Sequence, residues 1–391
     1  MKPTHKVLFV FCPMLVLVFI YYSSGKLHLH VWGHKPQAEP PLSVVAPTTR
    51  RTVPPDSEVD STLIAGQVVG SVYDKQGFLL NLDGKLPAEL SYKYGNLSEG
   101  MCKPGYAAAK MTTIYPKFMK PAPMFLDRNF KRLAKVSHYL PPFGFKTQER
   151  IIDLILTATK NYGLSEELDS LGCRRCVIVG NGGILANKSL GSRIDEYDVV
   201  VRLNEAPVTG YGRDVGTKTT LRITYPEGAI QRAERYESSS LFVFSAFKPL
   251  DFKWLRQMVF KEKLRGTEGF WKSVAHQVPR EPGDIRILNP FFIQEAAFQF
   301  IGLPLNNGLM GKGNIPTLGT VAITMALHNC DEVAVAGFGY DMTTPHAPLH
   351  YYETVKMSAI KESWTHNISK EKEFLRKLVK ANVITDLTNG I

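Results

Sequence analysis

From about residue 170 onward, short apolar runs alternate with longer amphipathic stretches. The runs lie at residues 176–180, 197–203, 241–247, 286–288 and 332–337. Apolar residues that follow one another in this way, instead of alternating with polar ones, are typical of parallel strands that are covered on both faces. The spacing of apolar residues predicts helices over 149–162, 291–301, 318–328 and 369–381, the last with Ser369 as its cap. This alternation predicts an α/β protein, a layered sheet flanked by helices.

The first residues of the chain show a different pattern. Residues 7–22 read VLFVFCPMLVLVFIYY, sixteen residues without a charge, and they follow Lys2 and Lys6. An average bilayer requires ~20 such residues, but a thin early-secretory membrane accepts fewer. A cleaved signal peptide is the alternative, because small residues follow at 23–25. We predict a cytosolic tail at 1–6 and an uncleaved signal-anchor at 7–22.

Proline dominates the next part of the chain. Residues 31–55 contain six prolines and little periodic apolar pattern. Such a segment cannot bury enough apolar surface to offset the conformational entropy of its chain. We therefore predict a stem at 23–75 and a single lumenal catalytic domain at 76–391.

The amino-acid composition is that of a globular protein. The apolar fraction is 44% and the charged fraction 21%, which is ordinary for a globular protein and excludes a collagen-like, coiled-coil or disordered chain. The formal net charge is +11, and a basic surplus of this size suits an anionic ligand.

The five cysteines bear on the compartment. Cys12 lies within the apolar stretch, which leaves four cysteines with three ways of forming two bridges. Cys173 and Cys176 also have the C-x-x-C spacing of zinc and redox sites, but no second close pair accompanies them. Two disulfides are the favoured interpretation. Asn96 and Asn187 begin N-glycosylation triplets, which matter only in the secretory pathway.

Glycine-rich turns follow two of the predicted strands. Asn181-Gly182-Gly183 follows the run CVIVG, and a turn of this kind lets backbone N–H groups approach a phosphate. The next strand ends in Asn204, where a dinucleotide-binding protein would carry an acidic residue. Thr317 is a plausible cap for the helix at 318–328, and the first turn of that helix can face an anion.

The sequence lacks the motif that is typical of metal-dependent sugar transfer. The chain has no Asp-x-Asp triplet with which to hold a divalent ion against a pyrophosphate. His346, His350 and His366 instead gather in a polar segment after the final predicted core strand. Histidine titrates near ambient pH and suits a general base that removes a hydroxyl proton.

Four ordered stretches together resemble the animal sialyltransferase family. They are residues 173–222, residues 316–341, the run His350–Glu353, and His366 with Glu371 five positions later. The resemblance implies a modified GT-A (Rossmann-like) fold, an inverting displacement with CMP-sialic acid as donor, and no metal or other cofactor. It implies transfer to the 3-hydroxyl of galactose at the ends of glycans, on a Golgi membrane. It implies no nucleic-acid partner and is compatible with a homodimer.

The same resemblance implies roles for individual residues. His366 would be the general base on the galactose hydroxyl, and His350 would bind the leaving phosphate. Cys176 would pair with Cys330, and Cys102 with Cys173. A glycan on Asn367 would crowd the base, so we expect this triplet to be unmodified. Contacts with the donor nucleotide are implied for Asn181, Asn204, Thr317, Gly319 and Gly339.

Three alternatives stay open on the sequence alone. The same donor chemistry could serve a glycolipid or a mucin-type core-1 acceptor. A nicotinamide-dependent oxidoreductase on a Rossmann sheet is a second alternative, although Asn204 argues against it. A catalytically silent, membrane-anchored lectin is the third.

Overall fold

We analysed a computed structural model of the chain. It describes residues 71–82, 86–118, 121–264, 266–306, 311, 313–362 and 364–391, all within one compact unit that spans Gln67–Ile391. The predicted tail, signal-anchor and most of the predicted stem lie outside the described residues. Among the residues that are described, no helix has the length and apolar character needed to cross a membrane.

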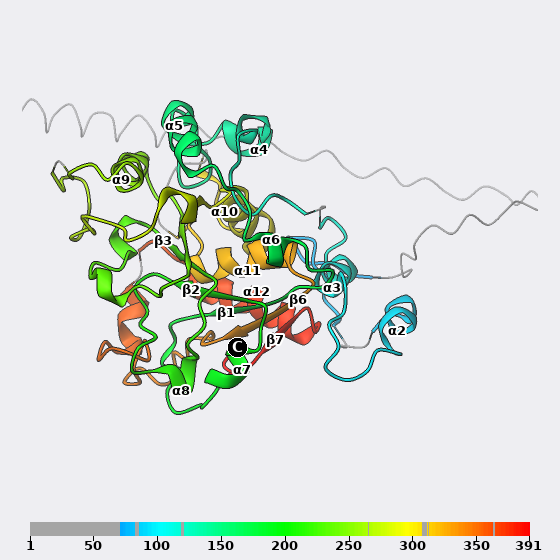
Figure 1. The fold of residues 1–391 in the computed structure, drawn as a ribbon. Coiled ribbons are helices and arrows are strands. Elements are labelled where there is room, and N and C mark those ends of the chain that lie inside the picture. Colours follow the sequence, from blue (N-terminus) through cyan, green and yellow to red (C-terminus); the bar gives the residue numbers. More distant parts are fainter. Residues whose placement is uncertain are drawn as a thin grey trace, which may run out of the picture. The chain divides into compact units, whose positions relative to one another are not determined.

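The centre of the unit is a sheet of seven parallel strands (Figure 1). Their order across the sheet is β5-β4-β3-β2-β1-β6-β7. The bounds are β1 Arg175–Val179, β2 Val199–Leu203, β3 Leu221–Thr224, β4 Leu241–Phe244, β5 Ile285–Ile287, β6 Glu332–Ala336 and β7 Ile384–Asp386.

The strand order reverses between β1 and β6. The chain adds β2 to β5 on one side of β1 and then returns to place β6 on the other side. The connection after β1 therefore leads to β2 on one side, and the connection after β6 leads to β7 on the other. In open α/β sheets, ligands bind at such a switch point.

Helices cover both faces of this sheet (Figure 1). The α-helices are α2 Ala88–Tyr94, α3 Tyr106–Ile114, α4 Ala134–Ser137, α5 Glu149–Thr159, α6 Glu166–Asp169, α7 Gly191–Asp195, α8 Gly212–Val215, α9 Pro249–Val259, α10 Phe291–Gln294, α11 Leu318–Asn329 and α12 Ile368–Lys380. A π-helix, η6 Glu295–Ile301, continues α10. The short 3-10 helices are η1 Phe130–Arg132, η2 Gly183–Leu185, η3 Pro226–Gly228, η4 Ala233–Arg235, η5 Pro282–Asp284 and η8 Met357–Glu362.

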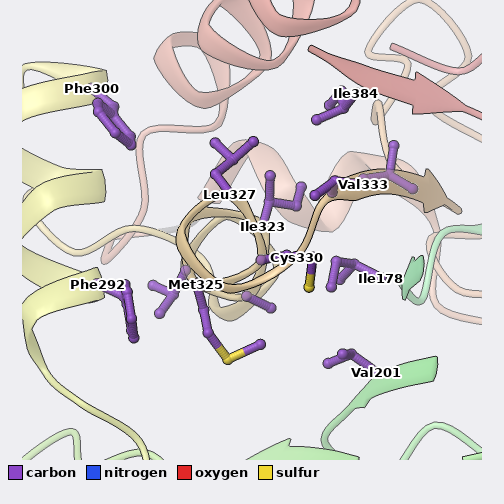
Figure 2. Packing of buried hydrophobic residues seen from close by; sticks show 14 of the residues in the cluster. Ile178, Val201, Phe292, Phe300, Ile323, Met325, Leu327, Cys330, Val333 and Ile384 are labelled. Carbon is purple, nitrogen blue, oxygen red and sulfur yellow. The ribbon is translucent and has the colours of Figure 1, made fainter. Parts of the chain in front are cut away.

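Helix α11 is the centre of the largest apolar cluster. Its sequence LGTVAITMALHN is apolar nearly all round, as expected of a helix that is buried on every side. Figure 2 shows why: Ile178 and Val333 of the sheet lie on one side of α11, and Phe292 and Phe300 of α10 and η6 lie on the other. The opposite face of β1, β2 and β6 packs against residues of η2, α7 and α8, and α5 and α9 pack beside β4 and β5.

The predicted α/β sheet flanked by helices is confirmed, and each of the five predicted strands is present with ends that differ by no more than three residues. Two strands were missed. Strand β3 carries Arg222, which interrupts the apolar pattern although it is buried. Strand β7 has only three residues and lies at the edge of the sheet.

Two predictions about helices were wrong in detail. The helix expected over 291–301 is a short α-helix followed by a π-helix. Neither segment contains a glycine or proline from which this change of helix type could have been predicted. Helix α12 is capped by Asn367 and not by Ser369, since the Asn367 side chain accepts a hydrogen bond from the Lys370 N–H at 3.1 Å. An amide oxygen two positions earlier thus satisfies one of the unpaired N–H groups of the first turn.

Both disulfides implied by the resemblance are present. Cys102 is bonded to Cys173, and Cys176 to Cys330. The second bridge joins the start of β1 to the carboxyl end of α11, two elements that meet in the core. The two cysteines of the C-x-x-C motif therefore belong to different bridges, which excludes a zinc or redox role for this pair.

Candidate functional site

A cavity of about 620 Å³ opens at the carboxyl edge of the sheet. The residues that follow five of the strands line it, as the switch-point rule predicts. They are Asn181 after β1, Asn204 and Glu205 after β2, Tyr225 after β3, Ser245 after β4, and Gly337 and Phe338 after β6.

The amino-terminal turn of α11 faces this cavity. Thr317, Leu318 and Gly319 line it. Thr317 is the cap of the helix, as predicted, and its side chain accepts from the Thr320 N–H. The backbone dipoles of a helix sum to a partial positive charge at this end, so the turn suits a bound phosphate.

Glu371 holds that turn in place from α12. Its carboxylate accepts hydrogen bonds from the Thr317 N–H at 2.9 Å, the Thr317 hydroxyl at 2.5 Å and the Thr320 hydroxyl at 2.6 Å. Burial raises the pKa of Glu371, and the neighbouring His366 and these hydrogen bonds partly offset the rise. Glu371 is 4% exposed, so it acts by positioning α11 and not by contact with a ligand in the cavity.

His366 lies beside the same turn in a fixed orientation. Its Nδ1 is 2.8 Å from the Ile315 carbonyl oxygen. A carbonyl oxygen can only accept, so Nδ1 carries the proton and Nε2 carries the lone pair in the neutral ring. Backbone hydrogen bonds from Gly313 to Trp364 and from Ile315 to Thr365 hold the two chain segments together. His366 lines the cavity, with its ring held in this orientation.

His350 enters the cavity from the segment after β6. Its backbone forms a β-bridge with Gly182. Its Nδ1 pairs with the Glu353 carboxylate, and its ring stacks on Tyr352 with centroids 5.5 Å apart. The Tyr352 hydroxyl in turn accepts from the Asn181 amide at 3.4 Å. These contacts fix the imidazole with Nε2 as the nitrogen left for a ligand.

Asn181 and Asn204 present their amides to the cavity from neighbouring strands. Within the described chain, Asn181 Oδ1 is a buried acceptor without a hydrogen-bond partner, as expected of a group that awaits a ligand. Asn204 has a φ of 51°, a left-handed conformation that asparagine tolerates. The buried Arg222 donates to the Asn204 and Ala206 carbonyls at 2.8 and 3.0 Å and so fixes this turn.

The glycine turn after β1 differs from its predicted role. The N–H groups of Gly180 and Gly182 donate to the carbonyls of Ala336 and Gly337 and not toward a ligand. A Cβ on Gly182 would lie 2.6 Å from the Gly337 oxygen. These glycines therefore let the loops after β1 and β6 approach each other closely.

Two other predicted residues lie apart from the cavity. Gly339 is not among the residues that line it. A Cβ at this position would lie 1.9 Å from the Gly390 carbonyl oxygen, so the lack of a side chain at Gly339 lets the carboxyl-terminal residues pack against it. His346, in the same polar segment as His350, is exposed and does not line the cavity.

An aromatic wall on the β3–β4 side of the cavity was missed. Tyr225, Phe247 and Trp271 form it, with ring centroids 5.2 to 6.0 Å apart. Burial raises the pKa of Tyr225 to about 12, so its hydroxyl stays protonated. The available signal was the run Phe270-Trp271-Lys272 in an otherwise polar loop. Within the described residues, no group of three or more His, Cys, Asp or Glu side chains could hold a metal ion.

Comparison with known proteins identifies the family. Residues 125–383 match the sequence model described as glycosyltransferase family 29 (sialyltransferase). The chain belongs to this family. Its members transfer sialic acid from CMP-sialic acid to galactose, which confirms the resemblance and removes the oxidoreductase alternative.

Relatives of this sialyltransferase match between 74% and 99% of its length. The human CMP-N-acetylneuraminate-beta-1,4-galactoside alpha-2,3-sialyltransferase is 66% identical over 99% of this chain and 98% of its own length. The mouse protein of the same name is 64% identical with the same coverage. The human lactosylceramide alpha-2,3-sialyltransferase is 42% identical over 74% of this chain and 71% of its own length.

A solved structure shows that this sialyltransferase shares its fold with a distant relative. The crystal structure of a mammalian sialyltransferase aligns with a TM-score of 0.55 at 23% identity, over 74% of this chain and 98% of that chain.

Proposed function

We propose that the chain transfers sialic acid from CMP-sialic acid to the 3-hydroxyl of terminal galactose on Galβ1,3GlcNAc and Galβ1,4GlcNAc glycans. The high identity to relatives named beta-1,4-galactoside alpha-2,3-sialyltransferase supports the linkage and the acceptor. The observation that carries the chemistry is the orientation of His366, whose Nδ1 donates to the Ile315 carbonyl beside the amino-terminal turn of α11.

In the proposed reaction His366 acts as general base. Nε2 takes the proton of the galactose 3-hydroxyl as that oxygen attacks the anomeric carbon of sialic acid. The bond from this carbon to the phosphate oxygen breaks, CMP leaves, and the anomeric configuration inverts. General-base assistance of this kind usually contributes about 100- to 10,000-fold in rate.

The departing phosphate gains negative charge, and two groups are suited to stabilise it. The first turn of α11 offers the positive end of its helix dipole. His350, oriented by Glu353, offers Nε2 as a donor when the ring is protonated. In this proposal Asn181, Asn204, Thr317 and Gly319 contact the nucleotide, and Gly339 supports the loop beside it.

We propose that the reaction needs no divalent metal, since a single phosphate requires less neutralisation than the pyrophosphate of other sugar donors. Transfer in the presence of excess EDTA is expected to equal transfer with added manganese. Strict dependence on manganese would contradict the proposal.

We further propose a Golgi location, with residues 7–22 as the signal-anchor, the catalytic unit in the lumen and a homodimer as the assembly. Two disulfides support an oxidising compartment. Asn96 and Asn187 are both exposed and accessible to glycosylation. The side chain of Asn367 is half-buried and caps α12, which supports the expectation that it stays unmodified.

The decisive experiment is a transfer assay with labelled CMP-sialic acid, followed by linkage analysis of the product. Galβ1,4GlcNAc, Galβ1,3GlcNAc, Galβ1,3GalNAc and lactosylceramide serve as parallel acceptors. Sialic acid in α2,3 linkage on the first two supports the proposal. Preference for lactosylceramide would favour the glycolipid alternative, which the 42% identical relative makes the second candidate. Absence of transfer would favour a silent lectin.

A further inference from the structure

The donor of this reaction carries two negative charges close to its reacting carbon. One is the phosphodiester, and the other is the carboxylate bonded directly to the anomeric carbon. The groups described above for the phosphate, His350 and the first turn of α11, come from the β1–β6 side of the cavity. They leave the carboxylate without an assigned partner.

Among the described residues that line the cavity, Lys272 is the only lysine or arginine. It follows Trp271, which packs against residues that come after β3 and β4, whereas His350 is bridged to Gly182 after β1. Its Nζ is 3.2 Å from a carboxylate oxygen of Glu205, which also lines the cavity. Both side chains are nearly half-exposed, at 46% and 45%. An exposed ion pair of this kind contributes little to stability, so separating the two side chains costs little free energy.

The residues on either side of Lys272 are held in place. The Lys248 ammonium lies over the Trp271 ring at 4.4 Å and is itself neutralised by the buried Glu227 and Asp251, at 2.6 and 2.8 Å. Gln231 donates to the Ser273 carbonyl at 3.0 Å. Lys248 therefore already has carboxylate partners and does not line the cavity, whereas Lys272 does.

From this arrangement we propose that Lys272 recognises the carboxylate of the donor's sialic acid, exchanging its partner Glu205 for that carboxylate when the donor binds. The inference rests on CMP-sialic acid being the donor. Before the donor binds, Glu205 pairs with the Lys272 ammonium, and the Glu205 carboxylate would repel the donor if Lys272 were absent. The pair thus selects a sugar nucleotide with a carboxylate beside the anomeric carbon.

The test compares Lys272→Gln and Lys272→Arg in the full chain, with CMP-sialic acid as varied substrate and CMP as competitive inhibitor. Lys272→Gln is expected to raise the donor KM about tenfold, the size typical of a lost charge-assisted hydrogen bond. The inhibition constant of CMP, which lacks the carboxylate, is expected to stay within twofold. Lys272→Arg is expected to restore most of the affinity. Lys253→Gln, an exposed lysine of α9 that does not line the cavity, is the matched control.

Each other outcome overturns the inference. A donor KM within twofold of wild type would show that Lys272 does not contact the donor. An equal rise of the donor KM and the CMP inhibition constant would place Lys272 on the phosphate instead. Glu205→Gln removes the competing carboxylate and is expected to lower the donor KM; an unchanged or higher value would overturn the exchange of partners. A wild-type chain that does not use CMP-sialic acid at all would refute the proposed function. This result is seen with the wild type alone and is therefore distinct from the outcomes of the variants.

Discussion

At the scale of single residues, the orientation of His366 determines what its ring can do. The Ile315 carbonyl fixes the proton on Nδ1, so the lone pair of the neutral ring lies on Nε2. We predict that His366→Ala lowers kcat by about 100- to 10,000-fold, because the galactose hydroxyl loses its general base. The affinity for CMP is expected to persist, because the proposed nucleotide contacts lie on other residues. Steady-state kinetics and calorimetric titration with CMP measure the two quantities.

His346→Ala is the matched control for this prediction. His346 belongs to the same polar segment as His350 but is exposed and does not line the cavity. Its removal is expected to leave kcat unchanged. Near-normal turnover of His366→Ala, or an equal loss in the control, would contradict the assignment of the base.

At the scale of elements, Glu371 couples α12 to α11. Its carboxylate accepts three hydrogen bonds from Thr317 and Thr320. We predict that Glu371→Ala lowers the free energy of unfolding by about 2–3 kcal/mol, since the buried donors at Thr317 lose their acceptor. Glu371→Gln keeps an amide oxygen for the Thr317 N–H and is expected to lose less. Chemical denaturation of both variants measures the difference.

We also predict that the contribution of the Glu371 carboxyl group to folding stability depends on pH. Burial raises the pKa of Glu371 above its ordinary value of 4.5, so ionisation of this group is less favourable in the folded protein than in the unfolded chain. The contribution of this group to stability is therefore complete below pH 4.5 and declines as the pH rises through the raised folded value. The stability of wild type relative to Glu371→Gln is expected to fall over that interval. A relative gain with rising pH would show that the hydrogen bonds outweigh burial.

The disulfide between β1 and α11 is the second link between elements of the site. Cys176 and Cys330 close a sequence separation of 154 residues and are both buried. We predict that replacing both by serine lowers the free energy of unfolding by about 2–5 kcal/mol, which is typical for loss of a native bridge. Activity at 37 °C is expected to fall with it. Thermal melting and transfer assays check this, and a variant as stable and active as wild type would contradict it.

The sequence predicted the strands whose two faces are both covered by the core, and it failed for a strand that buries a charged side chain. The apolar runs of β1, β4 and β6 are covered on both faces, so composition alone reveals them. Strand β3 was missed because Arg222 lies at a buried position in it. There the guanidinium forms an ion pair with Glu237 and donates hydrogen bonds to two backbone carbonyls. The contacts of Glu371 and Lys272 depend on loops more than 50 residues away in the chain, and no local pattern encodes such distances.

At the scale of the whole molecule, the remaining question is where the catalytic unit begins. The compact unit starts at Gln67, whereas proline content predicts a stem that extends to residue 75. Asp74 lies between these limits. Its carboxylate accepts from the backbone N–H groups of Gln76, Gly77 and Phe78 and pairs with Lys377 of α12. Burial alone would raise the pKa of Asp74, but these partners outweigh burial and the pKa is lowered.

We therefore predict that a chain beginning at Gln67 is more stable than one beginning at Gln76. Phe78 is 1% exposed and stacks on Tyr115 with centroids 4.6 Å apart, so the turn that Asp74 holds anchors a core residue. Loss of the Asp74 contacts is expected to lower the free energy of unfolding by about 1–3 kcal/mol. Because the pKa of Asp74 is lowered in the folded state, its contribution is present above its ordinary value of 3.8 and declines as the pH falls below it. Denaturation of the two truncated chains at pH 7 and at pH 3.5 measures this: the difference is expected to shrink at the lower pH, and equal stability at pH 7 would place the start of the folded unit at residue 76.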